Sequence, residues 1–120
     1  MSSPRRQELE NLLLVACGAV PGALLRWQLP EPRSANLLGC LLLGLLLPQG
    51  SRRPRLVLLA GIGFCGSLTT FSTWILGLNS NLNRGGLPSF GQQLSMDLLA
   101  GLAALAFGLA LARLPSLIRR

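Results

Sequence analysis

Four stretches of 15 or more residues contain no charged residue, and their lengths limit what the chain can fold into. They are residues 11–25, 34–51, 56–83 and 98–112 of 120. A helix that crosses the hydrocarbon core of a membrane needs about 20 residues, which these stretches approach once their polar ends are counted. No segment alternates polar and apolar residues as a half-buried strand would. We therefore predict an all-α integral membrane protein, one domain over residues 1–120, with four transmembrane helices at about 9–29, 34–49, 56–79 and 92–113.

The composition supports a membrane protein over a soluble one. Only 12% of the residues are charged and half are hydrophobic, whereas about 25% of a typical soluble domain is charged. All eleven basic residues are arginines that stand between apolar stretches. This distribution indicates charges that set the topology in the bilayer, so we predict no nucleic-acid partner.

The arginines also predict an orientation. Four spans would place both termini and the second connection on one side of the membrane. That side carries eight arginines, namely Arg5, Arg6, Arg52, Arg53, Arg55, Arg113, Arg119 and Arg120. The other side carries three, namely Arg26, Arg33 and Arg84. Because cytoplasmic loops are enriched in arginine, both termini are predicted in the cytoplasm of a multi-pass protein of the inner (plasma) membrane.

Neither an enzyme nor a cleaved leader is predicted. The three cysteines, Cys17, Cys40 and Cys65, lie inside apolar stretches, and the chain has no histidine. This leaves no nucleophile–base pair and no metal-ligand spacing. The N-terminal charges precede an apolar stretch, as in a signal peptide, but no small-residue cleavage site follows. We interpret this stretch as a retained first helix.

Small residues recur every four positions on three of the predicted helices. The sets are Gly18 and Gly22 before Arg26; Asn36, Cys40 and Gly44; and Ala100, Ala104, Gly108 and Ala112. This spacing puts each set on one helix face, where small side chains let backbones approach closely. Either these faces form tight helix–helix contacts, or small residues are simply frequent in membrane helices.

Three polar side chains fall near the ends of the predicted spans, and each has a structural explanation beside a functional one. Arg26 can extend to the membrane surface. Asn36 can cap the second helix or line a polar pathway. Asp97 can interact with the N-terminal dipole of the fourth helix, which we favour over a functional role.

The third span carries its polarity at its centre, in GIGFCGSLTTFSTW at 61–74. Each of its three glycines weakens a helix by about 1 kcal/mol relative to alanine. A break at membrane depth is tolerated only where the backbone is buried in protein or lines a polar cavity. Carbonyls freed there are suitable ligands for a hard cation. Phe71 and Trp74 share a face beyond the break, and the positive edges of their rings can face an anion.

Residues 63–74, GFCGSLTTFSTW, resemble the signature of the Fluc (CrcB) fluoride channel family, usually GFCGG-x-TTFSTF. GALLRW at 22–27 and AN-x-x-G at 35–39 are also similar to that family. Two positions depart from the signature: Ser67 replaces a glycine and Trp74 replaces a phenylalanine. The indole keeps a polarised edge and adds an N–H donor, but its bulk can reshape the pathway.

The resemblance implies an antiparallel, dual-topology dimer with two fluoride pathways and a structural Na⁺ on the dimer axis. It implies that backbone carbonyls of Gly66 and Thr69 from both subunits hold the sodium. It also implies a pathway formed by side chains that include an amide, two aromatic rings and hydroxyls, with an arginine in the first helix. In this sequence the pathway residues are Asn36, Phe71, Trp74, Ser72 and Thr73, and the arginine is Arg26, which we expect to be a structural polar residue.

The function implied is a passive, fluoride-selective channel that exports cytoplasmic fluoride and so gives fluoride resistance. Fluoride is small and strongly hydrated, so a pore must replace its water with close donors. One alternative is a four-helix proton-coupled multidrug exporter, which needs a membrane-embedded carboxylate that the first helix lacks. The other alternative is a non-transporting membrane assembly subunit.

The arginine bias bears on the dimer. An antiparallel homodimer requires the same chain to insert in both orientations, which is easiest when the charge bias is weak. Eight arginines against three is a strong bias, although Glu8 and Glu10 offset part of it. We predict a homodimer and leave open a heterodimer with an oppositely oriented paralogue.

Overall fold

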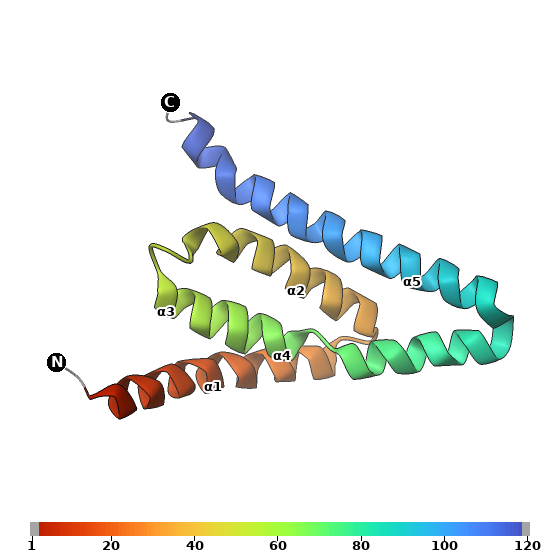
Figure 1. The fold of residues 1–120 in the computed structure, drawn as a ribbon, viewed down its shortest axis with the longest axis horizontal. Helices are drawn as coiled ribbons and strands as arrows, with labels where there is room; N and C mark the ends of the chain where they lie inside the picture. Colours follow the sequence, from red (N-terminus) through yellow and green to blue (C-terminus); the bar gives the residue numbers. More distant parts are fainter. Residues whose placement is uncertain (1–2, 119–120) are drawn as a thin grey trace.

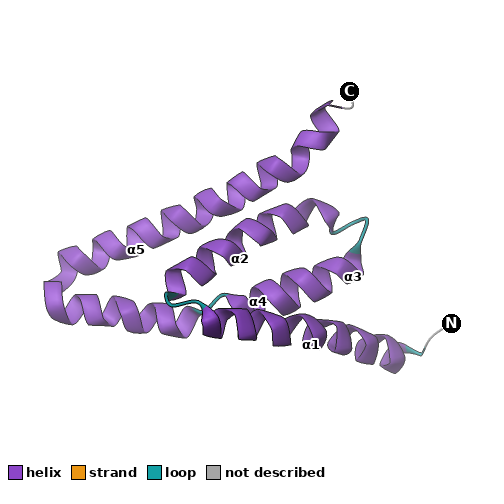
Figure 2. Cartoon of the chain, turned by 180° about the vertical axis from the view of Figure 1, so that it is seen from behind, coloured by secondary structure: helices purple, strands orange, loops and turns teal. Residues whose placement is uncertain are grey.

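The computed structural model describes residues 3–118, and its regular structure is helical throughout that range (Figure 1). Short loops separate some of the helices (Figure 2). The elements are α1 (Pro4–Gln28), α2 (Pro32–Leu46), η1 (Leu47–Gln49), α3 (Pro54–Leu56), η2 (Val57–Cys65), α4 (Gly66–Leu68) and α5 (Phe71–Ile118). No strand occurs among the described residues. The predicted all-α class is therefore confirmed.

Proline marks the start of three of these helices. Pro4, Pro32 and Pro54 each occupy the first turn of α1, α2 and α3. The first N–H groups of a helix have no intrahelical acceptor, so proline loses nothing there and its fixed φ favours the helix. The sequence thus places the helix starts at the connections between the apolar stretches.

α5 is bent at Gly86 and consists of two arms, residues 71–85 and 87–118. Gly86 has φ 71° and ψ −168°, the one positive φ among the described residues. A residue without a Cβ adopts this conformation at little cost, which allows the chain to reverse there. Figure 1 shows the first arm running away from α4 and the second arm returning above α2.

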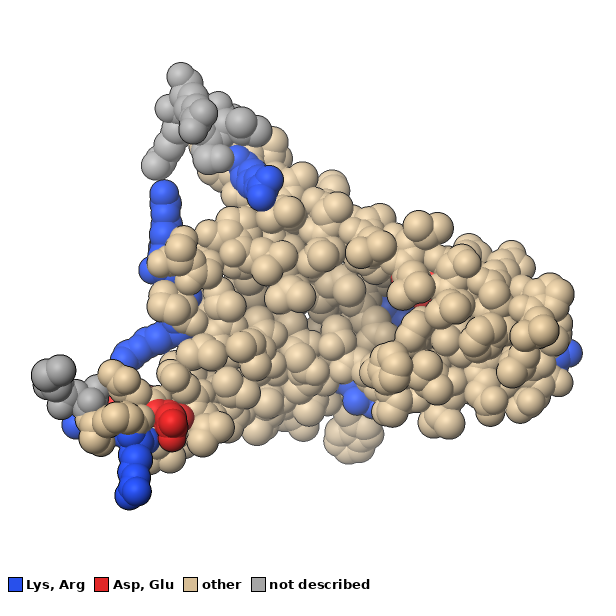
Figure 3. Space-filling view, viewed as in Figure 1, with Lys and Arg blue, Asp and Glu red and all other residues tan. Residues whose placement is uncertain are grey.

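The helices form two packed groups. α1 lies along η2 and α4, and α2 packs against α5 (Figures 1 and 2). Both ends of the chain and the connection from α2 to α3 lie at one end of the molecule. The bend at Gly86 lies at the other end. Figure 3 shows most of the visible arginines at the first end. Of the eight arginines predicted on that side, Arg119 and Arg120 lie outside the described residues.

Glycines make both groups close-packed. A Cβ on Gly18 would collide with the backbone carbonyl of Leu59, and one on Gly22 with the Ser67 hydroxyl and the Phe64 carbonyl. The same holds across the second group, where Gly44 lies against Leu105 and Gly108 lies against Leu41. The tight helix–helix contacts predicted from the four-residue spacing are therefore present.

The apolar side chains mostly face outward. Only Ala35, Cys65, Leu68 and Leu78 form the buried hydrophobic core of the described residues, while twenty large hydrophobic side chains are exposed. Two helical stretches, Pro4–Gln28 and Pro54–Pro115, are long and apolar enough to cross a membrane, and their most apolar 18-residue windows have mean hydropathies of 1.5 and 2.0. Only 11% and 6% of their most apolar windows is buried, so these helices are not the core of a soluble domain.

The helical path from residue 54 to residue 85 is interrupted at Thr69 and Thr70. Thr69 has extended backbone angles, with ψ 150°, between the end of α4 and the start of α5. The glycines themselves remain helical: η2 is wound as a π-helix, and Gly66 has φ −63° and ψ −35°. The break therefore follows the glycines, whose role in η2 is close contact: a Cβ on Gly63 would approach the Val15 carbonyl of α1.

Candidate functional site

The side chain of Asn36 bridges the break. Its Oδ1 accepts a hydrogen bond from the Thr70 backbone N–H at 2.7 Å, and its Nδ2 donates to the Thr70 carbonyl at 3.2 Å. The amide therefore pairs with both backbone polar groups of Thr70, at the point where the helix is interrupted. Asn36 lies in the second turn of α2, whose N-cap position is Glu31. The capping role considered for Asn36 is therefore wrong.

This bridge leaves backbone carbonyls available at the end of α4. In a continuous α-helix the Thr70 N–H would donate to the Gly66 carbonyl, but here it donates to Asn36. Thr69 makes the last helical bond before the break, and both its N–H and its hydroxyl donate to the Cys65 carbonyl at 3.0 Å. Gly66 is exposed, and nothing lies within 4 Å of the Cβ position it lacks.

Thr70 begins α5 as its N-cap residue. Its Oγ1 accepts the Thr73 backbone N–H at 3.4 Å, in the usual bond from an N-cap side chain to the third helical residue. The same hydroxyl donates to Thr73 Oγ1 at 3.1 Å, and Arg26 Nη2 donates to that atom at 3.3 Å. A continuous polar connection thus runs from Arg26 on α1 through Thr73 and Thr70 to Asn36 on α2.

The two aromatic residues follow the break on the first turn of α5. The rings of Phe71 and Trp74 are tilted by 56° with centroids 5.7 Å apart. The Phe71 side chain is 73% exposed and the Trp74 side chain is half-buried. Tilted rings at this spacing present their edges, which carry positive potential, toward neighbouring groups.

Two cavities divide the predicted site residues. A cavity of about 500 Å³ is lined by five of them, namely Asn36, Gly66, Thr69, Phe71 and Trp74. A second cavity of about 420 Å³, beside the exposed Trp27, is lined by Arg26 and Thr73. Ser72 is exposed and lines neither cavity. Seven of the eight predicted residues therefore line one of these two cavities.

Asp97 is a member of the site that the sequence did not identify. Its Oδ2 accepts the indole N–H of Trp74 at 2.9 Å, and the residue lines the larger cavity. The second arm of α5 begins at residue 87, ten residues before Asp97, and a helix dipole acts only within the first turn. The predicted dipole role is therefore wrong. The available signal was Trp74 itself, because a buried indole N–H requires an acceptor.

Comparison with known proteins agrees with this geometry. Residues 13–109 match the family described as CrcB-like protein, Camphor Resistance (CrcB). The chain belongs to the CrcB-like family. The resemblance of the central segment to the Fluc (CrcB) signature is thereby confirmed, over a match that includes both cavities and the helix break.

Curated relatives of the CrcB-like family carry a functional name. The chain is 50% identical over 113 residues to the "Fluoride-specific ion channel FluC 2" of Parasynechococcus marenigrum (strain WH8102), with 90% of this chain and 85% of the relative covered. It is 42% identical to the "Fluoride-specific ion channel FluC" of Stutzerimonas stutzeri (strain A1501), covering 83% and 94%. It is 38% identical to "Fluoride-specific ion channel FluC 1" of Prochlorococcus marinus (strain NATL2A), covering 82% and 85%.

Proposed function

We propose that this chain is a passive, fluoride-selective channel that lets cytoplasmic fluoride leave the cell. One observation carries the proposal: an amide, two tilted aromatic rings and the end of a broken helix line a single cavity in a chain whose outer surface is apolar. The names of the relatives point to the same ion.

The residues present can replace the water around fluoride. Asn36 has two N–H donors, and the hydrogen bond to the Thr70 carbonyl uses one of them. The second N–H, the Ser72 and Thr73 hydroxyls and the ring edges of Phe71 and Trp74 supply the remaining close donors. Arg26 lines the separate cavity beside Trp27, where its charge attracts anions without holding one at the narrow part of the pathway.

Transport needs no energy input beyond the membrane potential. An inside-negative potential drives an anion outward by about 2.3 kcal/mol per charge per 100 mV. Hydrogen fluoride enters as a neutral molecule and ionises in a less acidic cytoplasm, where fluoride is trapped. An open, selective pathway is therefore sufficient to lower the cytoplasmic fluoride concentration.

We also propose that two copies assemble in antiparallel orientation, each with four transmembrane helices. Phe71, on the wall of the larger cavity, is 73% exposed although it is a large apolar residue. A second copy seated there would cover Phe71 and complete the pathway. The path from 54 to 115 would cross the membrane twice, because the bend at Gly86 reverses its direction.

A structural Na⁺ fits the end of α4. The Gly66 carbonyl has lost its helical partner, and both Gly66 and Thr69 line the larger cavity. Two carbonyls from each of two chains would give the hard cation an oxygen site of its preferred ligand type. Bound there, the ion would hold two broken helices together by charge–dipole attraction.

The identity of the second copy follows from the charge bias. We propose a homodimer, with a paralogue of opposite orientation as the alternative, in the inner (plasma) membrane. The names of the relatives distinguish FluC 1 from FluC 2 proteins, so paired paralogues remain compatible with this arrangement.

The contacts of Asp97 do not favour the exporter alternative. Proton-coupled export requires a carboxylate that exchanges its proton for a cationic substrate. Asp97 lies 2.7 Å from the Arg33 guanidinium and accepts two further hydrogen bonds, so it is already engaged by the protein.

Reconstitution of the purified chain in liposomes tests the proposal. Vesicles loaded with potassium fluoride are given valinomycin, and released fluoride is followed with a fluoride electrode. We expect rapid release of fluoride and retention of chloride in parallel vesicles. Release of neither ion, or equal release of both, would contradict a fluoride-selective channel.

A further inference from the structure

Asp97 is the centre of a polar cluster that joins three parts of the fold. Its Oδ2 accepts hydrogen bonds from Trp74 Nε1 at 2.9 Å and from Gln93 Nε2 at 2.8 Å. Its Oδ1 lies 2.7 Å from Arg33 Nη2. Arg33 comes from the start of α2, Trp74 from the first arm of α5, and Gln93 and Asp97 from its second arm. We call these four residues the Asp97 cluster.

The carboxylate is largely, though not fully, buried on the wall of the larger cavity. The Asp97 side chain is 11% exposed, whereas the Arg33 side chain is 43% exposed. Oδ1 and the guanidinium are close enough for an ion pair, but their alignment does not make a directed hydrogen bond. Arg33 therefore acts mainly through its charge, while Trp74 and Gln93 fix the orientation of the carboxylate.

Both charges lie beside the aromatic pair. Arg33, Phe71, Trp74 and Asp97 line the same cavity of about 500 Å³. An unpaired carboxylate in this wall would repel any anion that passed the rings, and the repulsion would be weakly screened away from bulk water. The positive charge of Arg33 cancels the negative charge of Asp97. Because the two groups are paired, Arg33 does not act on the anion as a free positive charge.

The hydrogen bond also decides which part of Trp74 can meet an anion. An indole has one polar donor, Nε1–H, and Asp97 accepts it. Bonds to an ionised acceptor are roughly twice as strong as neutral ones. The indole is thus fixed with its N–H turned to the carboxylate, and the ring edge that remains resembles the edge of the neighbouring Phe71.

We propose that Asp97 is a positioning residue that determines selectivity: it withholds the Trp74 N–H from the anion, and Arg33 cancels its charge. The inference rests on the proposed fluoride channel function. It explains how a tryptophan can stand where the family signature has phenylalanine. The pathway keeps a C–H edge at this position and gains no strong, fixed donor that would retain an ion.

A charge cycle with liposome flux as the readout tests the electrostatic part. Arg33→Gln leaves the carboxylate uncompensated, and fluoride release should slow on the order of tenfold. Asp97→Asn leaves an unpaired arginine, and chloride release should rise relative to fluoride. The double variant Arg33→Gln/Asp97→Asn has neither charge and keeps an acceptor for the indole, so fluoride release should recover to about the original rate.

The matched control for charge is Arg84→Gln. Arg84 lies on the same predicted side of the membrane but next to the bend at Gly86, and it lines neither cavity. This variant should release fluoride at the original rate. A double variant that releases fluoride as slowly as Arg33→Gln would overturn the charge-cancelling role. If the Arg33–Asp97 pair only stabilised the fold, replacing Asp97 as well would not restore the rate.

Indole NMR tests the positioning part without any flux measurement. The ¹⁵N-labelled protein has two indole N–H resonances, from Trp74 and from Trp27, whose side chain is 86% exposed. The Trp74 resonance should stay fixed when sodium fluoride replaces sodium chloride. In Asp97→Ala it should move upfield and then respond to fluoride. A Trp74 resonance in the unsubstituted protein that shifts with fluoride would overturn the proposal.

The two measurements separate this inference from the proposed function. If the unsubstituted chain released no fluoride, the channel proposal would fail. An upfield shift of the Trp74 resonance in Asp97→Ala would still establish the contact between the indole and Asp97. If fluoride release were selective but the Trp74 resonance did not change in Asp97→Ala, the positioning role would fail and the channel would stand.

Discussion

Asn36 shows how one side chain can maintain a broken helix. Both polar groups of its amide are used at Thr70, at 2.7 and 3.2 Å. A backbone N–H or C=O left unpaired in a buried position costs about 1–3 kcal/mol, and Thr70 is 6% exposed. The break is therefore stable because a residue distant in sequence supplies what the helix no longer provides. The same bonds leave the Gly66 carbonyl without its helical donor, as the proposed Na⁺ site requires.

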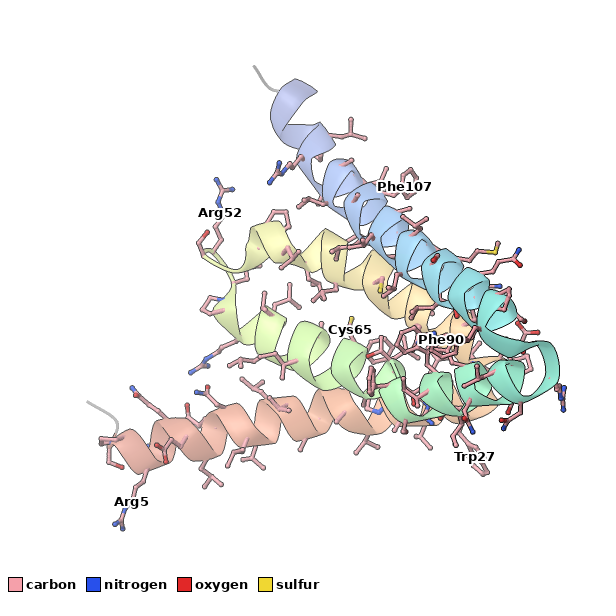
Figure 4. All side chains as sticks on the ribbon, turned by 45° about the vertical axis from the view of Figure 1, so that its right-hand side comes forward. Arg5, Trp27, Arg52, Cys65, Phe90 and Phe107 are labelled. Carbon is pink, nitrogen blue, oxygen red and sulfur yellow. The ribbon has the colours of Figure 1, made fainter. Side chains whose placement is uncertain are left out.

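Phe71→Ile tests the ring-edge role at the residue scale. Isoleucine keeps much of the apolar volume but removes the positively polarised edge. We expect fluoride release from liposomes to slow on the order of tenfold or more, while size-exclusion chromatography shows the same assembly. Phe107→Ile is the matched control, because Phe107 is 60% exposed, faces away from the helices (Figure 4) and lines neither cavity. Equal rates for both variants would reduce Phe71 to a packing role.

At the scale of elements, the glycines act through contact. Gly18 and Gly22 of α1 lie against η2 and α4 so closely that neither position has room for a Cβ. The wide π-helical turn of η2 brings the Gly66 N–H to the Gly61 carbonyl, five residues earlier. α1 packs along this segment and so supports the helix up to the point where it breaks.

Gly18→Ala is expected to destabilise the fold. The new Cβ would collide with the Leu59 carbonyl, which is part of a helix and cannot move aside. Overpacking of this kind costs about 1–3 kcal/mol, which should appear as a lower denaturation temperature in detergent. Gly77→Ala is the control: Gly77 is helical, exposed and open around its Cβ position, so alanine should stabilise the helix by up to about 1 kcal/mol. Equal changes in the two variants would contradict the contact argument.

At the scale of the whole molecule, the charge distribution governs orientation. The first end of the molecule carries Arg5 and Arg52 (Figure 4), and Glu10 there is paired with Arg6 at 3.3 Å and Arg55 at 3.4 Å. One carboxylate thus engages two of the eight arginines on this side. Exposed pairs of this kind add little stability, but they lower the effective bias that would hold the chain in a single orientation.

Accessibility of tags at both termini tests the homodimer. If the chain inserts in both orientations, each tag should be labelled from both sides of the membrane in similar amounts. A variant with Arg52 and Arg53 replaced by glutamine should keep this pattern, because it weakens the bias further. Labelling from the cytoplasmic side alone would exclude an antiparallel homodimer and leave the paralogous partner.

Local chemistry determined much of this protein before any tertiary contact was known. The uncharged stretches specify membrane helices. No water is present in the hydrocarbon core, so the backbone N–H and C=O groups of such a stretch must form hydrogen bonds within the protein, as they do in a helix. Pro4, Pro32 and Pro54 specify where helices begin. The central segment 61–74 places hydroxyl groups and aromatic rings next to each other. Its resemblance to the family signature was sufficient to predict the family.

Tertiary structure alone decided where the helix breaks and what each polar group contacts. The break falls at Thr69 and Thr70, after the glycines, because Asn36, on another helix, pairs with Thr70 and α1 holds η2 intact. Asp97 meets Trp74 across 23 positions because Gly86 reverses the chain between them. Such contacts depend on how helices pack against one another, and sequence spacing describes only the face of a single helix.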